Sequence, residues 1–152
     1  MKTHIEIFGK SSDTLSVRLT DIINYFKNKK ECYWSILWID GVIMKDEVKN
    51  IFSFQSVIDF ENSINKSTNG LRISIDDLYK IDLSTQQILN VLLISDKDLI
   101  NLKRFENDQD MYNSCSTIIE LIDGAYWEVS TDNNDFKNNI IENLDGLKIH
   151  EN

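Results

Sequence analysis

The sequence predicts an α+β fold, a single-domain sandwich in which a mostly antiparallel sheet packs with about three helices. Its apolar residues follow the order strand, helix, strand, helix, several strands and a final helix. Asp123-Gly124 suits a two-residue hairpin turn, and such turns join only antiparallel strands. The 152 residues include no proline and no Gly/Ser-rich linker, so nothing marks a domain boundary between residues 1 and 152. Helices placed on one meandering sheet give the sandwich.

The N-terminal region predicts a strand followed by an amphipathic helix. His4–Gly9 alternates apolar and polar residues, as a half-buried strand does. Ser11 and Ser12 suit the cap of the next helix, because a serine hydroxyl accepts a hydrogen bond from the first turn. The apolar positions of this helix recur every three to four residues and would face one core: Leu15, Leu19, Ile22, Ile23 and Phe26.

Tyr33–Met44 is rich in aromatic and β-branched residues, which favours a strand over a helix. Apolar residues occur on both of its faces, so we expect a central strand. One face carries Trp34, Ile36 and Trp38, and the other carries Tyr33, Ser35, Leu37 and Ile39. Asp40-Gly41 is expected to turn this run into a short hairpin.

A second helix is expected over Phe54–Asn65, with Ser53 as its cap and Gly70 as its stop. Its expected inward positions are Phe54, Val57, Ile58 and Ile64. Leu71–Ile75 then predicts a strand, and Asp76–Ile81 predicts a loop or a helical turn.

In the middle of the chain, the sequence pattern predicts secondary structure less clearly. Ser84–Leu92 has a mixed, largely polar pattern that does not separate a helix from a strand. Val91–Ser95 predicts a strand. The alternation within Asp98–Glu106 predicts the hairpin partner of that strand, with the turn near Asp96-Lys97.

The strongest local pattern is a hairpin formed by Ser116–Ile122 and Ala125–Ser130. The two runs alternate on either side of Asp123-Gly124, a dipeptide that tolerates the positive φ angles of a type I′ turn. Asp132 or Asn133 is expected to start a last helix, whose inward face is Phe136, Ile140, Ile141 and Leu144. Residues 146–150 predict an additional edge strand.

The second strand of this hairpin combines aromatic residues with an acid. Since side chains alternate along a strand, Trp127 and Val129 share one face, and Tyr126, Glu128 and Ser130 share the other. We expect the Trp127 face to be buried and the Tyr126 face to be exposed. An exposed tyrosine beside an acid suits a protein-docking surface, although plain packing explains the pattern equally well.

Charge is the clearest compositional feature. Sixteen Lys and Arg against 25 Asp and Glu leave a net charge of −9 and a pI near 4.6. Such a surface repels phosphate backbones, because nucleic-acid affinity depends on cations that displace counterions. We therefore expect no nucleic-acid partner and an electrostatic attraction for a basic protein. The alternative is that the acidity serves only solubility.

Targeting and membrane signals are not found. The N-terminus lacks the apolar run of a secretory signal, and the longest apolar runs, such as Val91–Ile94, are far too short to span a bilayer. We therefore expect a cytoplasmic protein without a membrane partner. The two cysteines form no CxxC motif and no Cys/His cluster.

Catalytic signatures are also missing, so we expect no enzyme and no cofactor. The two histidines, His4 and His150, lie near opposite ends of the chain, and no GxSxG, HExxH or Walker motif occurs. Pairs of acids are the remaining candidates for metal or acid/base chemistry, because hard cations require neighbouring carboxylates. An EF-hand loop counted from Asp96 or Asp108 lacks its glycine and glutamate, so no metal site is expected.

A resemblance to a known class of proteins lies in Ser116–Leu144, "STIIELIDGAYWEVSTDNNDFKNNIIENL", about a fifth of the chain. A hairpin ending in Tyr-Trp-Glu-Val and a capped helix with a polar outer face resemble the C-terminal part of small bacterial immunity proteins. These include the immunity proteins of contact-dependent growth inhibition and related polymorphic toxin systems. The strand Tyr33–Trp38 is compatible with this likeness. The ending is also similar to uncharacterised small Firmicute proteins, which implies no activity.

The immunity resemblance implies a non-catalytic, monomeric inhibitor that binds a cognate toxin C-terminal domain, often a nuclease, one to one in the cytoplasm. A nuclease must be cationic, so an acidic inhibitor can place carboxylates where the phosphates would lie. These families share no invariant binding residues, and charge and exposure therefore define the predicted toxin-binding set: Asp76, Asp77, Asp96, Asp98, Asp108, Asp110, Tyr126 and Glu128. The aspartates of this set are expected in loops beside the sheet.

Two alternatives remain open from the sequence. The first is a small metal- or metabolite-binding protein, or an enzyme, that uses the paired aspartates. The second is an interaction module that has no toxin as its partner.

Overall fold

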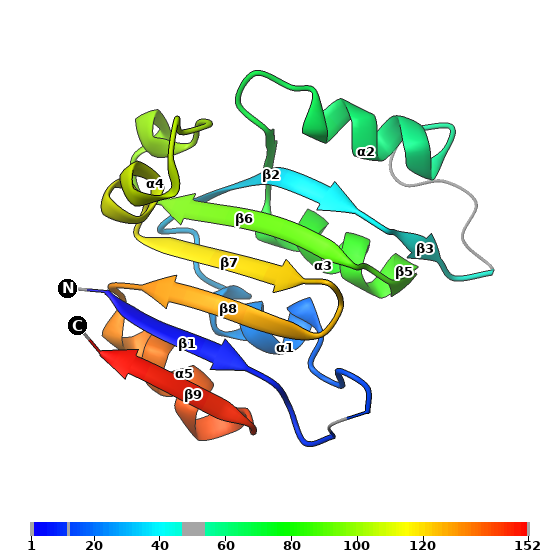
Figure 1. Ribbon diagram of the computed structural model, residues 1–152. Coiled ribbons are helices and arrows are strands. Elements are labelled where there is room, and N and C mark those ends of the chain that lie inside the picture. Colours follow the sequence, from blue (N-terminus) through cyan, green and yellow to red (C-terminus); the bar gives the residue numbers. More distant parts are fainter. Residues whose placement is uncertain (1, 12, 47–53, 152) are drawn as a thin grey trace.

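The computed structural model describes residues 2–11, 13–46 and 54–151. These residues form a seven-stranded sheet, a separate two-stranded sheet and five α-helices (Figure 1). The predicted α+β class and the mostly antiparallel sheet are confirmed. The helices number five among the described residues, rather than about three.

Every neighbouring pair of strands in the large sheet is antiparallel. Across the sheet the order is β4 (Leu71–Ile73), β2 (Tyr33–Asp40), β6 (Asn90–Asp96), β7 (Thr117–Ile122), β8 (Tyr126–Thr131), β1 (Thr3–Ile7) and β9 (Leu147–Glu151). The small sheet pairs β3 (Ile43–Met44) with β5 (Thr85–Gln87). The first and last strands therefore lie side by side at one edge of the large sheet (Figure 1).

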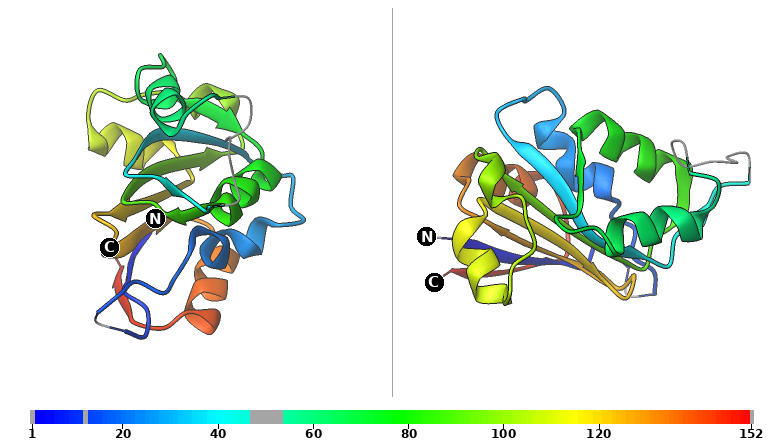
Figure 2. Two further views of the ribbon diagram at one scale, coloured as in Figure 1. Left: turned by 90° about the vertical axis from the view of Figure 1, so that its right-hand side faces the viewer. Right: turned by 90° about the horizontal axis from the view of Figure 1, so that it is seen from above.

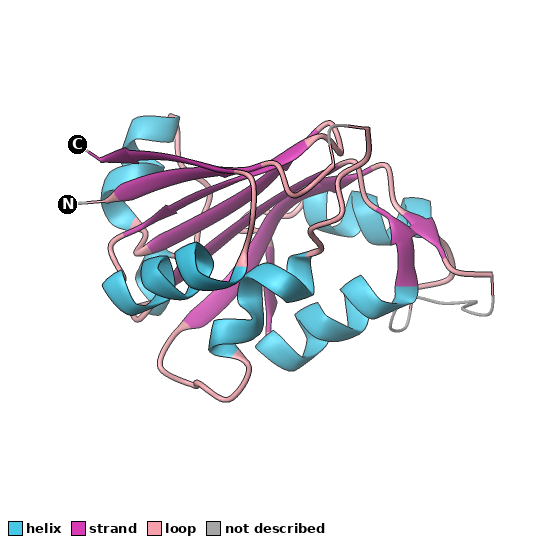
Figure 3. Cartoon of the chain, turned by 90° about the horizontal axis from the view of Figure 1, so that it is seen from below, coloured by secondary structure: helices cyan, strands magenta, loops and turns pink. Residues whose placement is uncertain are grey.

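The helices are distributed unequally over the two faces of the large sheet. One face is covered by α1 (Leu19–Ile23), the 3₁₀ turn η1 (Asn24–Phe26), α2 (Val57–Asn65), α3 (Ile75–Ser84) and α5 (Asn134–Asn143). In the described part of the chain, the other face is contacted by the segment that runs from the 3₁₀ turn η2 (Leu99–Asn101) to α4 (Asp108–Ser114). In the left view of Figure 2, α1, α3 and α5 lie on one side of the strands and α4 lies on the other, and Figure 3 shows a row of helices along one side of the strands.

The main core lies under the larger group of helices. Phe26 packs on Phe136 with ring centroids 4.7 Å apart and meets Trp34 edge-on at 5.0 Å. These rings join η1, α5 and β2, which are distant in sequence, so their burial is a major cohesive contribution. A smaller second core lies on the other face and consists of Leu37, Ile94, Leu102, Met111, Cys115 and Ile118.

The first helix begins later than the sequence predicts. It starts at Leu19, and Arg18 before it is extended, with φ −96° and ψ 163°. The Arg18 guanidinium donates hydrogen bonds to Asp82 and Thr85, which holds this residue outside the helix. Ser11 therefore does not cap the helix, and Ser12 lies outside the described residues.

The alternation of β2 is broken by an irregularity in its register between Ile36 and Trp38. The extra residue, Leu37, packs into the second core, so Trp38 faces away from the main core and is 44 % exposed. The expected common face of Trp34, Ile36 and Trp38 is therefore wrong for Trp38, and Ile39, expected on the other face, instead packs with Trp34 and Ile36 in the main core. The expected hairpin at Asp40-Gly41 is also wrong, because β3 pairs with β5.

The second helix begins at Val57 and is capped by Ser56, whose hydroxyl accepts a hydrogen bond from the Asp59 amide. Ser53 lies outside the described residues. Ile58 was expected to face inward but is 68 % exposed, and Phe60 is buried in its place.

Asp76–Ile81, expected as a loop or one helical turn, lies within the ten-residue helix α3. Ser74 caps this helix by accepting a hydrogen bond from the Asp77 amide. The undecided stretch Ser84–Leu92 contains the short strand β5 and the start of β6.

The expected strand over Asp98–Glu106 is wrong. Both neighbours of β6 are already present, β2 on one side and β7 on the other, so no position is left for a hairpin partner. The segment forms η2 and a loop that Arg104 anchors, since its guanidinium donates to the carbonyl oxygens of Leu37, Ile64 and Ser67. These bonds satisfy carbonyls at the end of α2 and beside the irregularity in β2.

The elements predicted for the C-terminal part of the chain agree best with the structure. Asp123 and Gly124 have φ angles of 52° and 65°, as the predicted type I′ turn requires. Asn133 caps α5 and accepts a hydrogen bond from the Phe136 amide, and β9 forms the predicted edge strand. Ile141 is wrong as an inward residue, because it is 41 % exposed.

Candidate functional site

The sheet face opposite the main core carries three glutamates on three adjacent strands. Glu120 on β7 lies directly opposite Glu128 on β8, and Glu128 lies opposite Glu6 on β1. Glu6, Glu120 and Glu128, called the glutamate row below, are all half-buried. Side chains directly opposite each other on antiparallel strands have Cβ atoms about 5 Å apart, so these like charges repel.

The electrostatic consequences extend to the neighbouring groups. Burial, together with the charges of Glu128 and Asp108, raises the pKa of Glu120 above its ordinary value. The pKa of the Tyr126 phenol is also raised, first by desolvation and then by the negative charges of the glutamate row. The pKa of Tyr112 is raised by burial and then by Glu120, Glu128 and Asp108. The sheet face that carries the glutamate row, called the open face below, therefore has a concentrated negative potential.

Basic groups do little to offset this potential. Among the described residues, neither Glu120 nor Glu128 forms an ion pair with a lysine or arginine. Glu6 lies 3.5 Å from Nε2 of His150, a contact that is ionic only when the imidazole is protonated. Lys148 lies opposite Glu6 in the register, but its ammonium group is placed 5.5 Å above the Phe8 ring. The row is thus left available to an external cation.

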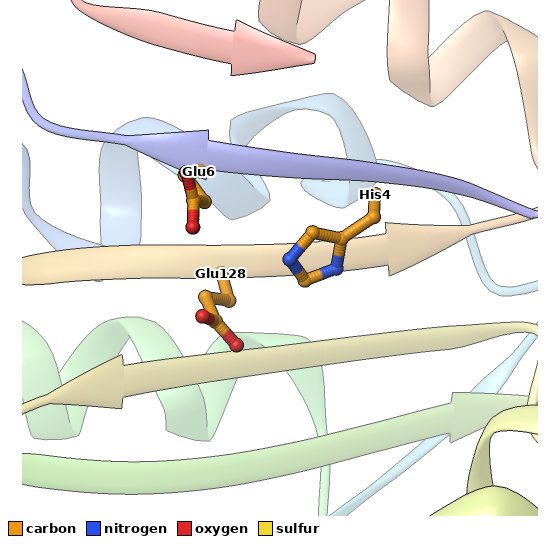
Figure 4. Close-up of side chains that lie close together, drawn as sticks. All are labelled: His4, Glu6 and Glu128. Carbon is orange, nitrogen blue, oxygen red and sulfur yellow. The ribbon is translucent and has the colours of Figure 1, made fainter. Parts of the chain in front are cut away.

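A histidine completes the polar centre of this face (Figure 4). One ring nitrogen of His4 and one carboxylate oxygen each of Glu6 and Glu128 all lie within 4.8 Å of one another. Nδ1 of His4 is 2.9 Å from the Ser130 hydroxyl oxygen, which fixes the orientation of the ring. An open hollow of about 630 Å³ adjoins His4, and its lining also includes Lys2, Gln109, Tyr112 and Asn113.

Aromatic side chains border the row on two sides. Phe8 stacks on Tyr126, with ring centroids 5.2 Å apart and planes 22° apart. At the β2 end, the partly exposed Trp38 lies opposite Leu92, which in turn lies opposite Glu120. Aromatic groups supply contact area with few rotatable bonds, so the face combines charge with apolar anchors.

The structure places the predicted toxin-binding residues in different parts of the molecule. Tyr126 and Glu128 lie on the open face, and Asp108, in the first turn of α4, contributes to the field at Glu120. Asp76 and Asp77 lie in the first turn of α3, which packs on the opposite face, and Asp77 is paired with Lys80 at 3.6 Å.

The remaining aspartates have local structural contacts. Asp96 is 9 % exposed and accepts hydrogen bonds from the amides of Asp98 and Ser116. Asp98 caps η2 by accepting from the Ile100 amide, and Asp110 accepts from the Asn107 side chain in the first turn of α4. The expected location in loops is wrong for all of the aspartates except Asp98, because the others lie in helices or end a strand.

The facing assignment for β8 is largely confirmed. Trp127 and Val129 are buried in the main core, whereas Tyr126 and Glu128 face the other way and are half-buried. Ser130 was expected to be exposed and is instead only 6 % exposed, because it bonds His4 on the neighbouring strand.

The sequence interpretation missed His4, Glu6 and Glu120 as site residues. The spacing of His4 and Glu6 does place them on one face of a strand. Their proximity to Glu128 depends on the pairing of β1 with β8, strands more than a hundred residues apart, and no local pattern encodes that register.

Comparison of the chain with protein families, with curated proteins and with solved structures finds no match. No helix in the described part of the chain is long and apolar enough to cross a bilayer.

The repulsion in the row leads to a stability prediction for Glu120→Gln. Because the folded state raises the pKa of Glu120, ionised Glu120 destabilises the fold at neutral pH. We expect the variant to be more stable than the wild type by about 0.5–1 kcal/mol at pH 7. As pH falls through the raised pKa towards the ordinary value of 4.5, the wild type binds its proton and the advantage disappears.

Urea unfolding at pH 7 and at pH 4 measures this difference. Glu106→Gln, at an exposed loop position, removes the same charge outside the row and serves as the control. An equal gain in both variants at pH 7 would attribute the effect to net charge and would contradict local repulsion.

Proposed function

We propose that this protein is an immunity-type inhibitor that binds a basic toxin domain through the open face of its sheet. The observation that carries the proposal is the glutamate row, three carboxylates on adjacent strands without lysine or arginine partners in the described chain. Such an arrangement costs stability in the free protein, and a bound cationic side chain offsets that cost.

The chemistry of the face fits arginine and lysine side chains. A guanidinium group donates two parallel hydrogen bonds, so one arginine can bridge neighbouring carboxylates of the row. Trp38 and the stacked pair of Phe8 and Tyr126 supply flat apolar surface beside the charges. The net charge of −9 steers a basic partner towards the protein at long range.

The segment that resembles immunity proteins contributes directly to this face. Ser116–Leu144 contains β7, β8 and α5, and its hairpin supplies Glu120, Tyr126 and Glu128. A nuclease toxin needs a cationic surface to bind its substrate, and an acidic sheet face is complementary to that surface. The likeness and the geometry therefore favour the same partner class.

The test compares two variants that each remove two negative charges. Glu120→Gln/Glu128→Gln alters the open face, and Asp76→Asn/Asp77→Asn alters the opposite side at α3. Each tagged protein is used to capture partners from a bacterium that carries the gene, and the captured proteins are identified by mass spectrometry. The captured domain is then expressed with each variant to measure protection of growth.

We expect the wild type and the α3 variant to retain a basic toxin domain and to protect growth. The open-face variant should raise the dissociation constant for the toxin domain by at least about tenfold, which corresponds to about 1.4 kcal/mol of binding free energy. Equally weakened toxin binding in both variants would show that net charge alone, and not the open face, accounts for the interaction. Failure of the wild type to retain any basic protein at low salt would overturn the proposal.

A further inference from the structure

We propose that His4, Glu6 and Glu128 form a binding site for a divalent transition-metal ion, with Zn²⁺ as the best-matched ion. The three side chains come from two neighbouring strands and lie on the same side of the sheet (Figure 4). This site goes beyond the toxin-binding proposal and does not depend on it, because it belongs to the isolated protein.

The distances among the ligand atoms support a shared ion. One imidazole nitrogen and two carboxylate oxygens lie within 4.8 Å of one another. Ligands about 2.1 Å from a tetrahedral Zn²⁺ are roughly 3.4 Å apart, so modest rotations of the two glutamate side chains close the site. The backbone needs no movement, since β1 is hydrogen-bonded on both sides, to β8 and to β9.

The orientation of His4 also suits a ligand. Nδ1 is engaged with the Ser130 hydroxyl at 2.9 Å, and Figure 4 shows the other ring nitrogen, Nε2, turned towards Glu6 and Glu128. Metal-binding histidines commonly have their second nitrogen held by a hydrogen bond in this way, which fixes the ring and its tautomer. Ser130 itself is almost fully buried, so this support is firm.

The charge of the surroundings favours a dication over an anion or a neutral ligand. Glu120 adds a third carboxylate next to Glu128, and Asp108 adds to the field at that position. The nearby basic groups are Lys2, which lines the hollow beside His4, Lys148, which lies over Phe8, and His150, whose Nε2 is 3.5 Å from Glu6. A metal ion at His4 therefore offsets the repulsion along the row.

The mixed ligand set selects among metal ions. Imidazole nitrogen is a preferred ligand of Zn²⁺, Co²⁺ and Ni²⁺, whereas Mg²⁺ and Ca²⁺ prefer sites made of oxygen atoms alone. The open side of the sheet leaves further coordination positions for water. We therefore expect tight binding of Zn²⁺ and Co²⁺, and much weaker binding of Mg²⁺ and Ca²⁺.

Isothermal titration calorimetry of the full chain with ZnCl₂ is the first test, repeated for the variants His4→Gln, Glu128→Gln and Glu120→Gln. The matched control is Glu120→Gln, which removes the same charge as Glu128→Gln at the adjacent position in the row but leaves all three ligands in place. Circular dichroism and thermal melting establish that each variant is folded before the titration is interpreted.

We expect one Zn²⁺ per chain, a loss of affinity of at least tenfold in His4→Gln and Glu128→Gln, and less than a threefold change in Glu120→Gln. Long-range ¹H–¹⁵N spectra should show Zn²⁺ shifting Nε2 of His4. No saturable binding by the wild type, or equal weakening in all three variants, would overturn the site. A protein that binds Zn²⁺ but captures no toxin would contradict the proposed function alone.

Discussion

Replacement of Trp127 by alanine is expected to lower the free energy of unfolding by about 3–5 kcal/mol. The indole is 3 % exposed and packs in the main core below β8. Its Nε1 donates a buried hydrogen bond of 2.8 Å to the carbonyl oxygen of Val17, in the segment before α1. The variant therefore opens a cavity and also leaves a buried carbonyl without its partner.

Urea unfolding monitored by circular dichroism measures the effect, and two further variants separate its causes. Trp127→Phe retains most of the apolar volume but removes the donor, so a loss of about 1–3 kcal/mol is expected. Tyr126→Ala changes the adjacent residue on the open face, where it loses the stacking on Phe8, and should cost only about 1 kcal/mol. Equal losses for Trp127→Ala and Tyr126→Ala would contradict the burial of the Trp127 face.

The parts of the fold that were predictable from the sequence are those that local chemistry determines. The hairpin of β7 and β8 depends on two positive φ angles, and Asp123-Gly124 provides them at the required positions. The start of α5 depends on one side-chain cap, and Asn133 lies directly before that helix. Such signals act over a few residues, so they can be read without knowledge of the tertiary structure.

The errors occur where a distant partner overrides the local pattern. Leu37 leaves the alternation of β2 because it packs into a second core that no local pattern reveals. Arg104 holds its segment as a loop through carbonyl groups of β2 and the end of α2. In both places the tertiary contact replaces the element that periodicity favours.

The candidate site was only half predictable for the same reason. Tyr126 and Glu128 were found because the alternation of a single strand separates their face from that of Trp127. The glutamate row and His4 require the registers of β7 with β8 and of β8 with β1. Grouping the aspartates by proximity in sequence instead selected Asp96, which stabilises its own loop.

Replacement of Arg18 by methionine is expected to lower the free energy of unfolding by about 3 kcal/mol. The side chain of Asp82 is 6 % exposed, and Arg18 approaches it through Nε at 3.3 Å and Nη2 at 3.2 Å. Arg18 also donates to the carbonyl of Thr85 at 3.0 Å. Methionine fills much of the same volume but leaves the carboxylate of Asp82 buried without a cation, and this uncompensated charge accounts for most of the loss.

A double-mutant cycle with Asp82→Asn tests that cause directly. Asparagine keeps an oxygen acceptor for the Thr20 amide, which Asp82 binds at 3.0 Å, while it removes the charge. If the loss comes from the unpaired charge, Arg18→Met/Asp82→Asn should recover more than about 1 kcal/mol relative to Arg18→Met alone. The exposed pair of Lys10 and Asp145 provides the comparison, and Lys10→Met should change stability by less than about 0.5 kcal/mol. Strictly additive losses at Arg18 and Asp82 would contradict the assignment of the loss to the unpaired charge of Asp82.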